Sequence, residues 1–203
     1  PKGPASRKPA PQSGMSPVLI GGVIVAVLAI GGYAMYNRAS GTAATAEAQS
    51  GAPEPSADAV AKANRDAALG PHKQATLPPI PFRGYEPPRA PAVVTAAFQF
   101  AAEHPEVASF VPCFCGCEAG GHSNNADCFV KRRADNGDVV EWEEHGVECA
   151  VCIDVATRSR QMQSSGAGAS AIRAAVEKEF TNPNFPNKMA TPKPPAAGAP
   201  TSH

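Results

Sequence analysis

Apolar residues recur at the spacing of amphipathic helices in four stretches of the chain after residue 55. These stretches predict helices at residues 56–69, 91–104, 149–163 and 171–180. Ser56 and Ser170 are suited to cap the first and the last helix, because a serine hydroxyl accepts hydrogen bonds from the free N–H groups of a first turn. The second helix must end before Pro105, since proline lacks the N–H that continues a helix.

One hairpin is expected between the second and third of these helices. Residues 128–132 and 138–142 flank Asn136-Gly137, a pair typical of tight hairpin turns. A short helix over residues 128–133 is an alternative, because strict alternation of apolar and polar residues is missing there. The predicted fold class is mainly α with a small β-hairpin.

An uncharged apolar run at residues 17–37 has the length needed to cross a bilayer as one helix. Three basic residues precede the run and mainly acidic ones follow it, so residues 1–16 are predicted to be cytoplasmic and the rest of the chain exported. A cleaved signal peptide is the competing interpretation, because alanine-rich sequence follows. We favour a single-pass anchor in the cell membrane, since the run is longer than the apolar part of most signal peptides.

Proline, alanine and small polar residues dominate on both sides of the expected domain. Residues 38–90 are predicted to be a linker and residues 183–203 a disordered tail, because neither holds enough large apolar residues to offset the entropy of ordering. The run at residues 77–82 is typical of polyproline-like backbone, which can lie across a folded domain. The cysteine-rich domain itself is assigned to residues 91–182.

Composition narrows the possible size of the core and the kind of partner. With 22 prolines, 18 glycines and only 6% aromatic residues, the chain cannot build one large core along its whole length. Its 18 basic and 18 acidic residues give a formal net charge of zero, so bulk charge does not favour a nucleic-acid partner.

All six cysteines fall within one window of 40 residues, residues 113–152. They are Cys113, Cys115, Cys117, Cys128, Cys149 and Cys152, and the window also holds His122 and His145. Cysteines at alternate positions cannot lie far apart, so the first three must crowd a small volume. Crowded sulfur suits Cu(I), Zn(II) or a set of disulfides far better than it suits a hydrophobic core.

The residues leave three uses of this sulfur open. A Cys-x-Cys-x-Cys segment is atypical of structural zinc sites, which favours copper with zinc as the alternative. An exported domain with an even number of cysteines is commonly held by disulfides, which makes a structural or interaction subunit the second interpretation. Cys149 and Cys152, at a helix start that lowers thiol pKa, also fit thiol–disulfide exchange. Met162 and Met189 are interpreted as a core and a tail residue.

The ordered motifs of this window resemble those of the bacterial PCYCGC-motif family. The resemblance rests on Pro112-Cys-Phe-Cys-Gly-Cys117, Gly121-His-Ser-Asn124, Asp127-Cys-Phe129, His145-Gly146 and Cys149-Ala-Val-Cys152, and it spans residues 93–180. Phe114 replaces the usual tyrosine of the motif. Many members look like exported lipoproteins, whereas this chain has an apolar run in place of a lipobox cysteine. The resemblance implies an exported, cysteine-rich domain and is compatible with metal handling.

We therefore predict a membrane-tethered, extracytoplasmic domain that binds a soft metal, Cu(I), for delivery or sequestration. The six cysteines are the expected ligands, with His122 and His145 as further candidates. The expected partners are the lipid bilayer, through one helix, and a neighbouring membrane complex. No catalytic residue is assigned, and an enzymatic role is not favoured.

Overall fold

The computed structural model describes residues 52–84 and 86–195, so the apolar run predicted to span a membrane lies outside the described residues. None of the helices in the described ranges is long and apolar enough to cross a bilayer. The membrane anchor therefore stays a prediction.

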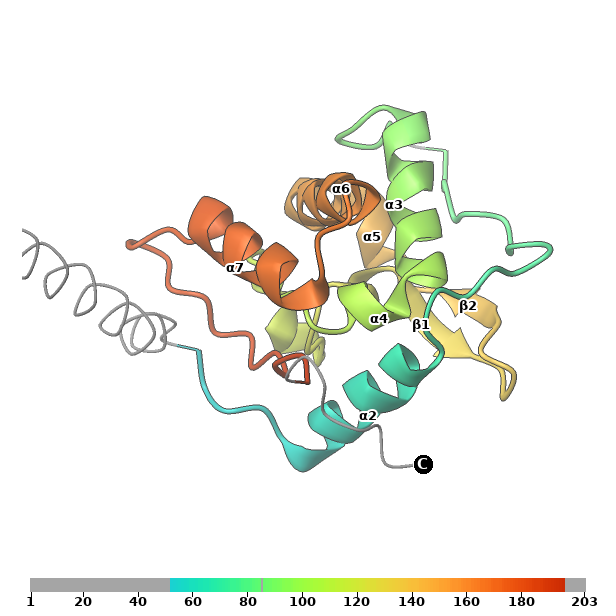
Figure 1. Ribbon diagram of the computed structural model, residues 1–203. Coiled ribbons are helices and arrows are strands. Elements are labelled where there is room, and N and C mark those ends of the chain that lie inside the picture. Colours follow the sequence, from blue (N-terminus) through green and yellow to red (C-terminus); the bar gives the residue numbers. More distant parts are fainter. Residues whose placement is uncertain (1–51, 85, 196–203) are drawn as a thin grey trace, which may run out of the picture. The chain divides into compact units, whose positions relative to one another are not determined.

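The described residues form six α-helices, two short 3-10 helices and one pair of strands (Figure 1). In chain order these are α2 (Ala57–Ala68), α3 (Pro91–Glu103), α4 (Pro105–Ala108), η1 (Cys117–Gly120), η2 (Ala126–Cys128), β1 (Val130–Arg133), β2 (Val139–Trp142), α5 (His145–Glu148), α6 (Ala150–Ser164) and α7 (Ala169–Phe180). The prediction of a mainly helical domain with a small hairpin is confirmed.

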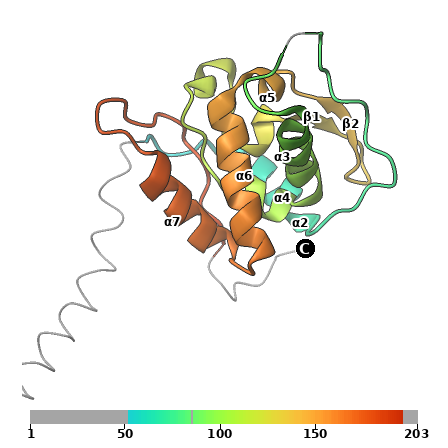
Figure 2. The ribbon, with the colours of Figure 1, turned by 90° about the horizontal axis from the view of Figure 1, so that it is seen from above.

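The core lies where α3 packs along α6, and α7 covers the other side of α6 (Figure 2). Phe98, on the buried side of α3, is the aromatic centre of this core. Its ring meets Phe129 and Trp142 edge to face, with centroids 5.1 and 5.2 Å away. These contacts join α3 to the hairpin and the loop before it, so the two parts of the fold share one core.

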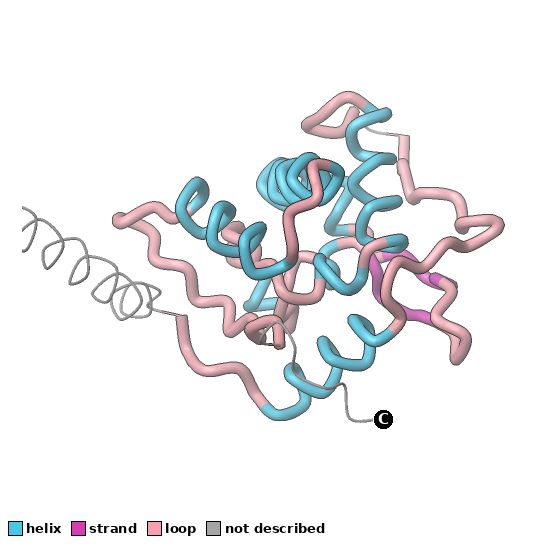
Figure 3. Tube along the Cα trace, in the orientation of Figure 1, coloured by secondary structure: helices cyan, strands magenta, loops and turns pink. Residues whose placement is uncertain are grey.

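The two strands lie side by side (Figure 3) and pair antiparallel. Their register shifts between Val130 and Arg133. A side chain from the segment before α3 forms hydrogen bonds with backbone groups at the open edge of β2. Gln74 accepts a hydrogen bond from the Val139 N–H at 2.7 Å and donates to the Val139 carbonyl at 3.0 Å. A glutamine amide thereby takes the place of a third strand.

The predicted helices are present, with one corrected boundary. Ser56 caps α2 as expected, with its hydroxyl accepting from the Ala59 N–H at 3.2 Å. The predicted cap at Ser170 is wrong, because α7 begins at Ala169 with Gly168 as its N-cap residue. The short helices α4 and α5 were not predicted; with four residues each they are too short to show a hydrophobic period.

Parts of the segments expected to be linker and tail pack on the domain. The indole of Trp142 donates to the Pro78 carbonyl at 2.8 Å, so the proline-rich run does cross the domain. On the other side, the Arg173 guanidinium on α7 donates to the carbonyls of Thr191 and Pro192 at 3.1 and 2.6 Å. Met189, interpreted from sequence as a tail residue, is only 1% exposed and belongs to the core.

Candidate metal centre

Three segments bring five of the cysteines to one place. Cys113, Cys115 and Cys117 follow α4, Cys128 ends η2, and Cys152 lies in the first turn of α6. Cys152 Sγ lies 3.1 Å from Cys113 Sγ and 3.5 Å from Cys115 Sγ. Cys117 Sγ lies 3.5 Å from Cys128 Sγ. The alternate cysteines thus crowd one small volume, and two more sulfurs join them.

A left-handed turn at Gly116 folds the Cys-x-Cys-x-Cys segment back on itself. Gly116 has φ +85°, which residues with a Cβ rarely adopt, and it is the N-cap residue of η1. Alternate residues of a straight strand are about 6.6 Å apart. Cys113 and Cys117 would thus be about 13 Å apart in a straight strand. Their Sγ atoms lie within 4.8 Å of each other, because the turn at Gly116 brings Cys117 back.

A close backbone approach at Gly146 places His145 beside the sulfurs. A Cβ at Gly146 would lie 2.5 Å from a ring carbon of Phe129 and 2.6 Å from the Cys128 carbonyl oxygen. Only glycine lets the short helix α5 pack this tightly against that segment. As a result, Nε2 of His145, the first residue of α5, lies 3.5 Å from Cys115 Sγ.

A buried asparagine joins the loop of residues 122–128 to the segments on either side of the cluster. Asn125 is 1% exposed. Its backbone N–H donates to the Val111 carbonyl at 2.7 Å, and its side-chain amide donates to the Cys152 carbonyl at 3.2 Å. These two bonds hold the start of α6 against the segment that carries the first three cysteines.

The donor atoms form two overlapping sets of four, each with all its donors within 4.8 Å of one another. The first set, which we name the buried set, is Cys113, Cys117, Cys128 and Cys152. The second, which we name the open set, is Cys115, Cys117, Cys152 and His145. Around an ion with bonds of about 2.3 Å, tetrahedral sulfur ligands lie about 3.8 Å apart. Both sets therefore match the spacing and the donor type of a soft metal ion.

Mutual hydrogen bonding shifts the pKa values of the thiols in opposite directions. Hydrogen bonding with Cys115 and Cys117 lowers the pKa of Cys113 to about 5. The pKa of Cys152 is raised, chiefly by hydrogen bonding with Cys113 and Cys115. The pKa of Cys117 is raised in the same way. The lowered pKa of Cys113 favours its thiolate, the form that binds metal.

All six cysteines lie in the described part of the chain, and all six are free thiols. The shortest sulfur–sulfur contact, 3.1 Å between Cys113 and Cys152, is well beyond the roughly 2.05 Å of a disulfide bond. The cysteine pair proposed for redox exchange is not the closest pair either, because Cys152 faces Cys113 and Cys115.

His122 and Cys149, two other predicted ligands, lie at the margin of the cluster and in neither set. The ring of His122 meets that of His145 edge to face, with centroids 5.6 Å apart. Its Nδ1 is buried and has no hydrogen-bond partner among the described residues. Cys149 is the N-cap residue of α6. Burial lowers the pKa of His145, but the hydrogen bond with Cys115 and the nearby Cys149 outweigh burial and raise it. Both residues border the open set.

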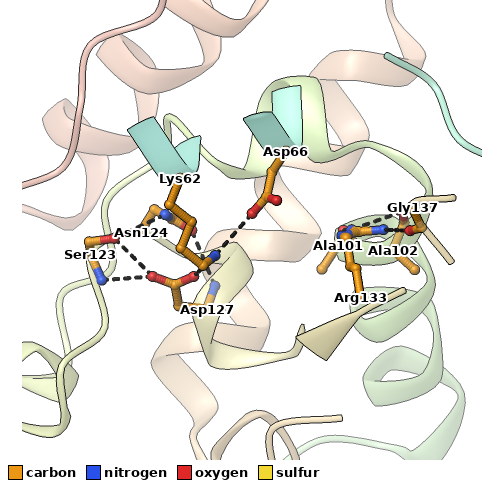
Figure 4. A network of polar contacts seen from close by, with 9 residues as sticks. All are labelled: Lys62, Asp66, Ala101, Ala102, Ser123, Asn124, Asp127, Arg133 and Gly137. Atoms are coloured by element: carbon orange, nitrogen blue, oxygen red, sulfur yellow. Dashed lines mark hydrogen bonds and ion pairs between the residues drawn. The ribbon is translucent and has the colours of Figure 1, made fainter. Parts of the chain in front are cut away.

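A polar network fixes the loop between His122 and Cys128 to α2 (Figure 4). Asp127 accepts from the backbone N–H and the hydroxyl of Ser123, both at 2.9 Å. Lys62 on α2 donates to Asp127 at 2.6 Å and to Asp66 at 2.9 Å. Burial opposes the charge of Lys62, but the two carboxylates outweigh it and raise its pKa. Sequence reasoning missed this link, because the partners are 65 residues apart.

Met189 also contacts the site, contrary to its interpretation as a tail residue. Its Sδ accepts a hydrogen bond from the backbone N–H of Cys113 at 3.2 Å. The thioether is therefore directed at the backbone behind the buried set. The signal available in the sequence was one of two large apolar residues in a proline-rich segment, which is too weak to indicate burial.

Comparison with known proteins places this site in a recognised family. A family model described as a protein of unknown function with PCYCGC motif matches residues 87–194. The search of curated proteins and the search of solved structures gave no significant match. The matched stretch covers more than half of the chain and includes all six cysteines, His122, His145 and Met189. The resemblance seen in the motifs is confirmed: the chain belongs to the PCYCGC-motif family.

Proposed function

We propose that this domain binds Cu(I) outside the cytoplasmic membrane, for delivery to a partner or for sequestration, and that residues 17–37 tether it there. The observation that carries the proposal is the buried set, in which four cysteine sulfurs lie within 4.8 Å of one another. Thiolates taken out of water repel one another at such distances, and a cation among them offsets that cost.

The donor types favour copper over other ions. Every donor of the buried set is sulfur, and the open set adds only an imidazole. Carboxylate and carbonyl oxygens, which suit Mg²⁺ and Ca²⁺, are in neither set, and thiolate is the ligand that selects Cu(I). Four sulfurs also suit Zn²⁺, which makes zinc the ion to test beside copper.

The burial of the cluster supports transport or storage of an ion over catalysis on it. Three of the four sulfurs of the buried set belong to residues that are 0% exposed, and the fourth belongs to Cys117 at 8%. A substrate cannot reach an ion enclosed on all sides, whereas a metal ion can be passed from ligand to ligand. The half-buried Cys115 and His145 then provide the route by which the ion arrives or leaves.

The deciding experiment is metal analysis with a thiol count on the full chain, purified without oxygen in mild detergent. We expect stoichiometric Cu(I), and loss of thiol reactivity when it binds. Cys113→Ser and Cys152→Ser should lose the ion of the buried set, whereas Cys149→Ser, outside both sets, should keep it. If the protein holds stoichiometric Zn²⁺ that Cu(I) does not displace, the bound ion is zinc and the copper proposal is wrong.

The disulfide interpretation remains the second candidate, and the approach of Cys113 to Cys152 favours it over exchange by Cys149. With a 3.1 Å separation between these sulfurs, a small movement would allow oxidation to a disulfide. A native protein with no bound metal, fewer than six titratable thiols and loss of structure on reduction would support this candidate and refute the metal site.

A further inference from the structure

We propose that the cluster holds two metal ions, bridged by the thiolates of Cys117 and Cys152. The inference rests on the proposed metal-binding function and adds the number of ions and their order of exchange. Its basis is the overlap of the two donor sets, because Cys117 and Cys152 are the only donors among the described residues that belong to both.

A single ion would leave good ligands unused at contact distance. A soft ion takes at most four sulfur or nitrogen ligands in this kind of site. If it takes the buried set, the Cys115 thiol and the His145 imidazole remain, 3.5 Å from each other and with Cys115 3.5 Å from Cys152. Two unused soft donors at this distance from a bound thiolate define a second position for an ion.

The contacts of Cys152 fit a bridging ligand. Its sulfur lies 3.1 Å from Cys113, which belongs to the buried set alone, and 3.5 Å from Cys115, which belongs to the open set alone. It therefore contacts one terminal ligand of each position, in a triangle of sulfurs whose third side, between Cys113 and Cys115, is 3.6 Å. A thiolate sulfur has more than one lone pair, so it can bind an ion on each side. Cys113 and Cys128 then complete one position, and Cys115 and His145 the other.

The two positions differ in their access to solvent. Cys113 and Cys128 are 0% exposed, whereas Cys115 and His145 are half-buried. Water and competing ligands reach the open position first. The ion held by Cys115 and His145 is therefore the one that exchanges, and the ion of the buried set is retained.

A titration of the reduced full chain with Cu(I), against a competing Cu(I) chelator and without oxygen, tests the inference. We expect two equivalents to bind in two phases of different affinity. His145→Ala and Cys115→Ser should each reduce this to one tight equivalent, and Cys117→Ser and Cys152→Ser should weaken both phases. His122→Ala, whose ring lies beside His145 but in neither set, should keep two equivalents.

The outcomes separate this inference from the function on which it rests. One equivalent in the wild type, unchanged in His145→Ala, would refute the second ion and leave the metal-binding function in place. No bound copper or zinc would refute both. Bridging has its own readout, because two ions that share thiolates give metal–metal scattering in X-ray absorption, which must vanish in His145→Ala. Two equivalents without that scattering would refute the bridge. Circular dichroism of each metal-free variant shows that it is folded.

Discussion

The two ends of the sulfur cluster use the same kind of ligand in different surroundings. At the buried end, Cys113, in the segment after α4, and Cys128, the last residue of η2, are 0% exposed. At the open end, Cys115 and His145 are half-buried and have His122 and Cys149 around them. Ligand chemistry alone would give the two ends nearly equal affinity for a soft metal ion. Access to solvent therefore decides which ion is retained and which one exchanges.

The packing behind the two ends differs as well. The buried end is backed by Met189 and by the core around Phe98. The open end depends on one short helix, α5, whose position is set by a close contact at Gly146. Changes at the buried end should therefore alter the stability of the whole domain, and changes at the open end should mainly alter the exchangeable metal.

The largest expected effect is the loss of metal-linked stability at the buried end. Free ligand at a thousand times Kd stabilises a folded protein by about 4 kcal/mol. We expect Cys128→Ser to lose most of this gain and Cys115→Ser to keep more than half of it. The measurement is chemical denaturation with and without chelator-buffered Cu(I), so that each variant serves as its own metal-free control. An equal loss in both variants would remove the difference between the two ends.

The next effect concerns the packing behind the buried end. Met189 is 1% exposed, so Met189→Ala should lower the free energy of unfolding by about 2–4 kcal/mol even without metal. Met189→Leu keeps the volume and should cost less than about 1.5 kcal/mol. Both values come from urea denaturation of the reduced protein. If Met189→Leu also lost copper, the thioether would have to be counted among the ligands.

Local signals in the sequence were enough to predict the longer helices and the hairpin. The serine cap of α2, the proline after α3 and the Asn-Gly turn each act within a few residues. The crowding of Cys113, Cys115 and Cys117 could be predicted for the same reason, because their spacing in the chain limits how far apart they can be.

The assembly of the site could not be predicted from such signals. His145 lies beside the sulfurs because α5 packs closely against Phe129. That close packing is possible only because residue 146 is glycine and has no side chain. Cys149 was predicted as a ligand on the strength of its spacing from Cys152, but as the N-cap residue of α6 it falls outside both donor sets. Met189 and Lys62 are each at least 37 residues from the nearest cysteine in the sequence. Hydrophobic periodicity does not report contacts between segments so far apart.

A smaller loss of stability is expected from a substitution at Gly146, where α5 packs against Phe129. Gly146→Ala would force a Cβ to within 2.5 Å of Phe129, so we expect a loss of about 1–3 kcal/mol and a shift of α5. His145 moves with that helix, and the exchangeable metal should weaken as it does in His145→Ala. Gly120→Ala is the matched control, because a Cβ there meets nothing within 4 Å. Full retention of the second copper in Gly146→Ala would show that the position of α5 does not matter for binding.

The smallest effect is expected at Lys62, which holds the loop that connects the two ends. Its side chain is 40% exposed, so solvent screening limits the contribution of its pairs, and we expect Lys62→Met to cost about 1 kcal/mol. Lys131→Met is the control, since Lys131 pairs with Glu141 on a more exposed surface and should cost less than about 0.5 kcal/mol.

The stability difference between wild type and Lys62→Met should change with pH in a direction that can be measured. The carboxylates of Asp127 and Asp66 overcome the effect of burial and raise the pKa of Lys62 above its ordinary 10.5. Its stabilising contribution is therefore complete below the unfolded pKa and is lost as the pH rises through the higher folded-state pKa. The difference in unfolding free energy between wild type and Lys62→Met should be constant from neutral pH to about 9.5 and shrink above about 10.5. A difference that stayed constant through pH 10.5 and above would mean that Lys62 stabilises the loop by packing alone, and one that grew with pH would mean that burial outweighs the two carboxylates.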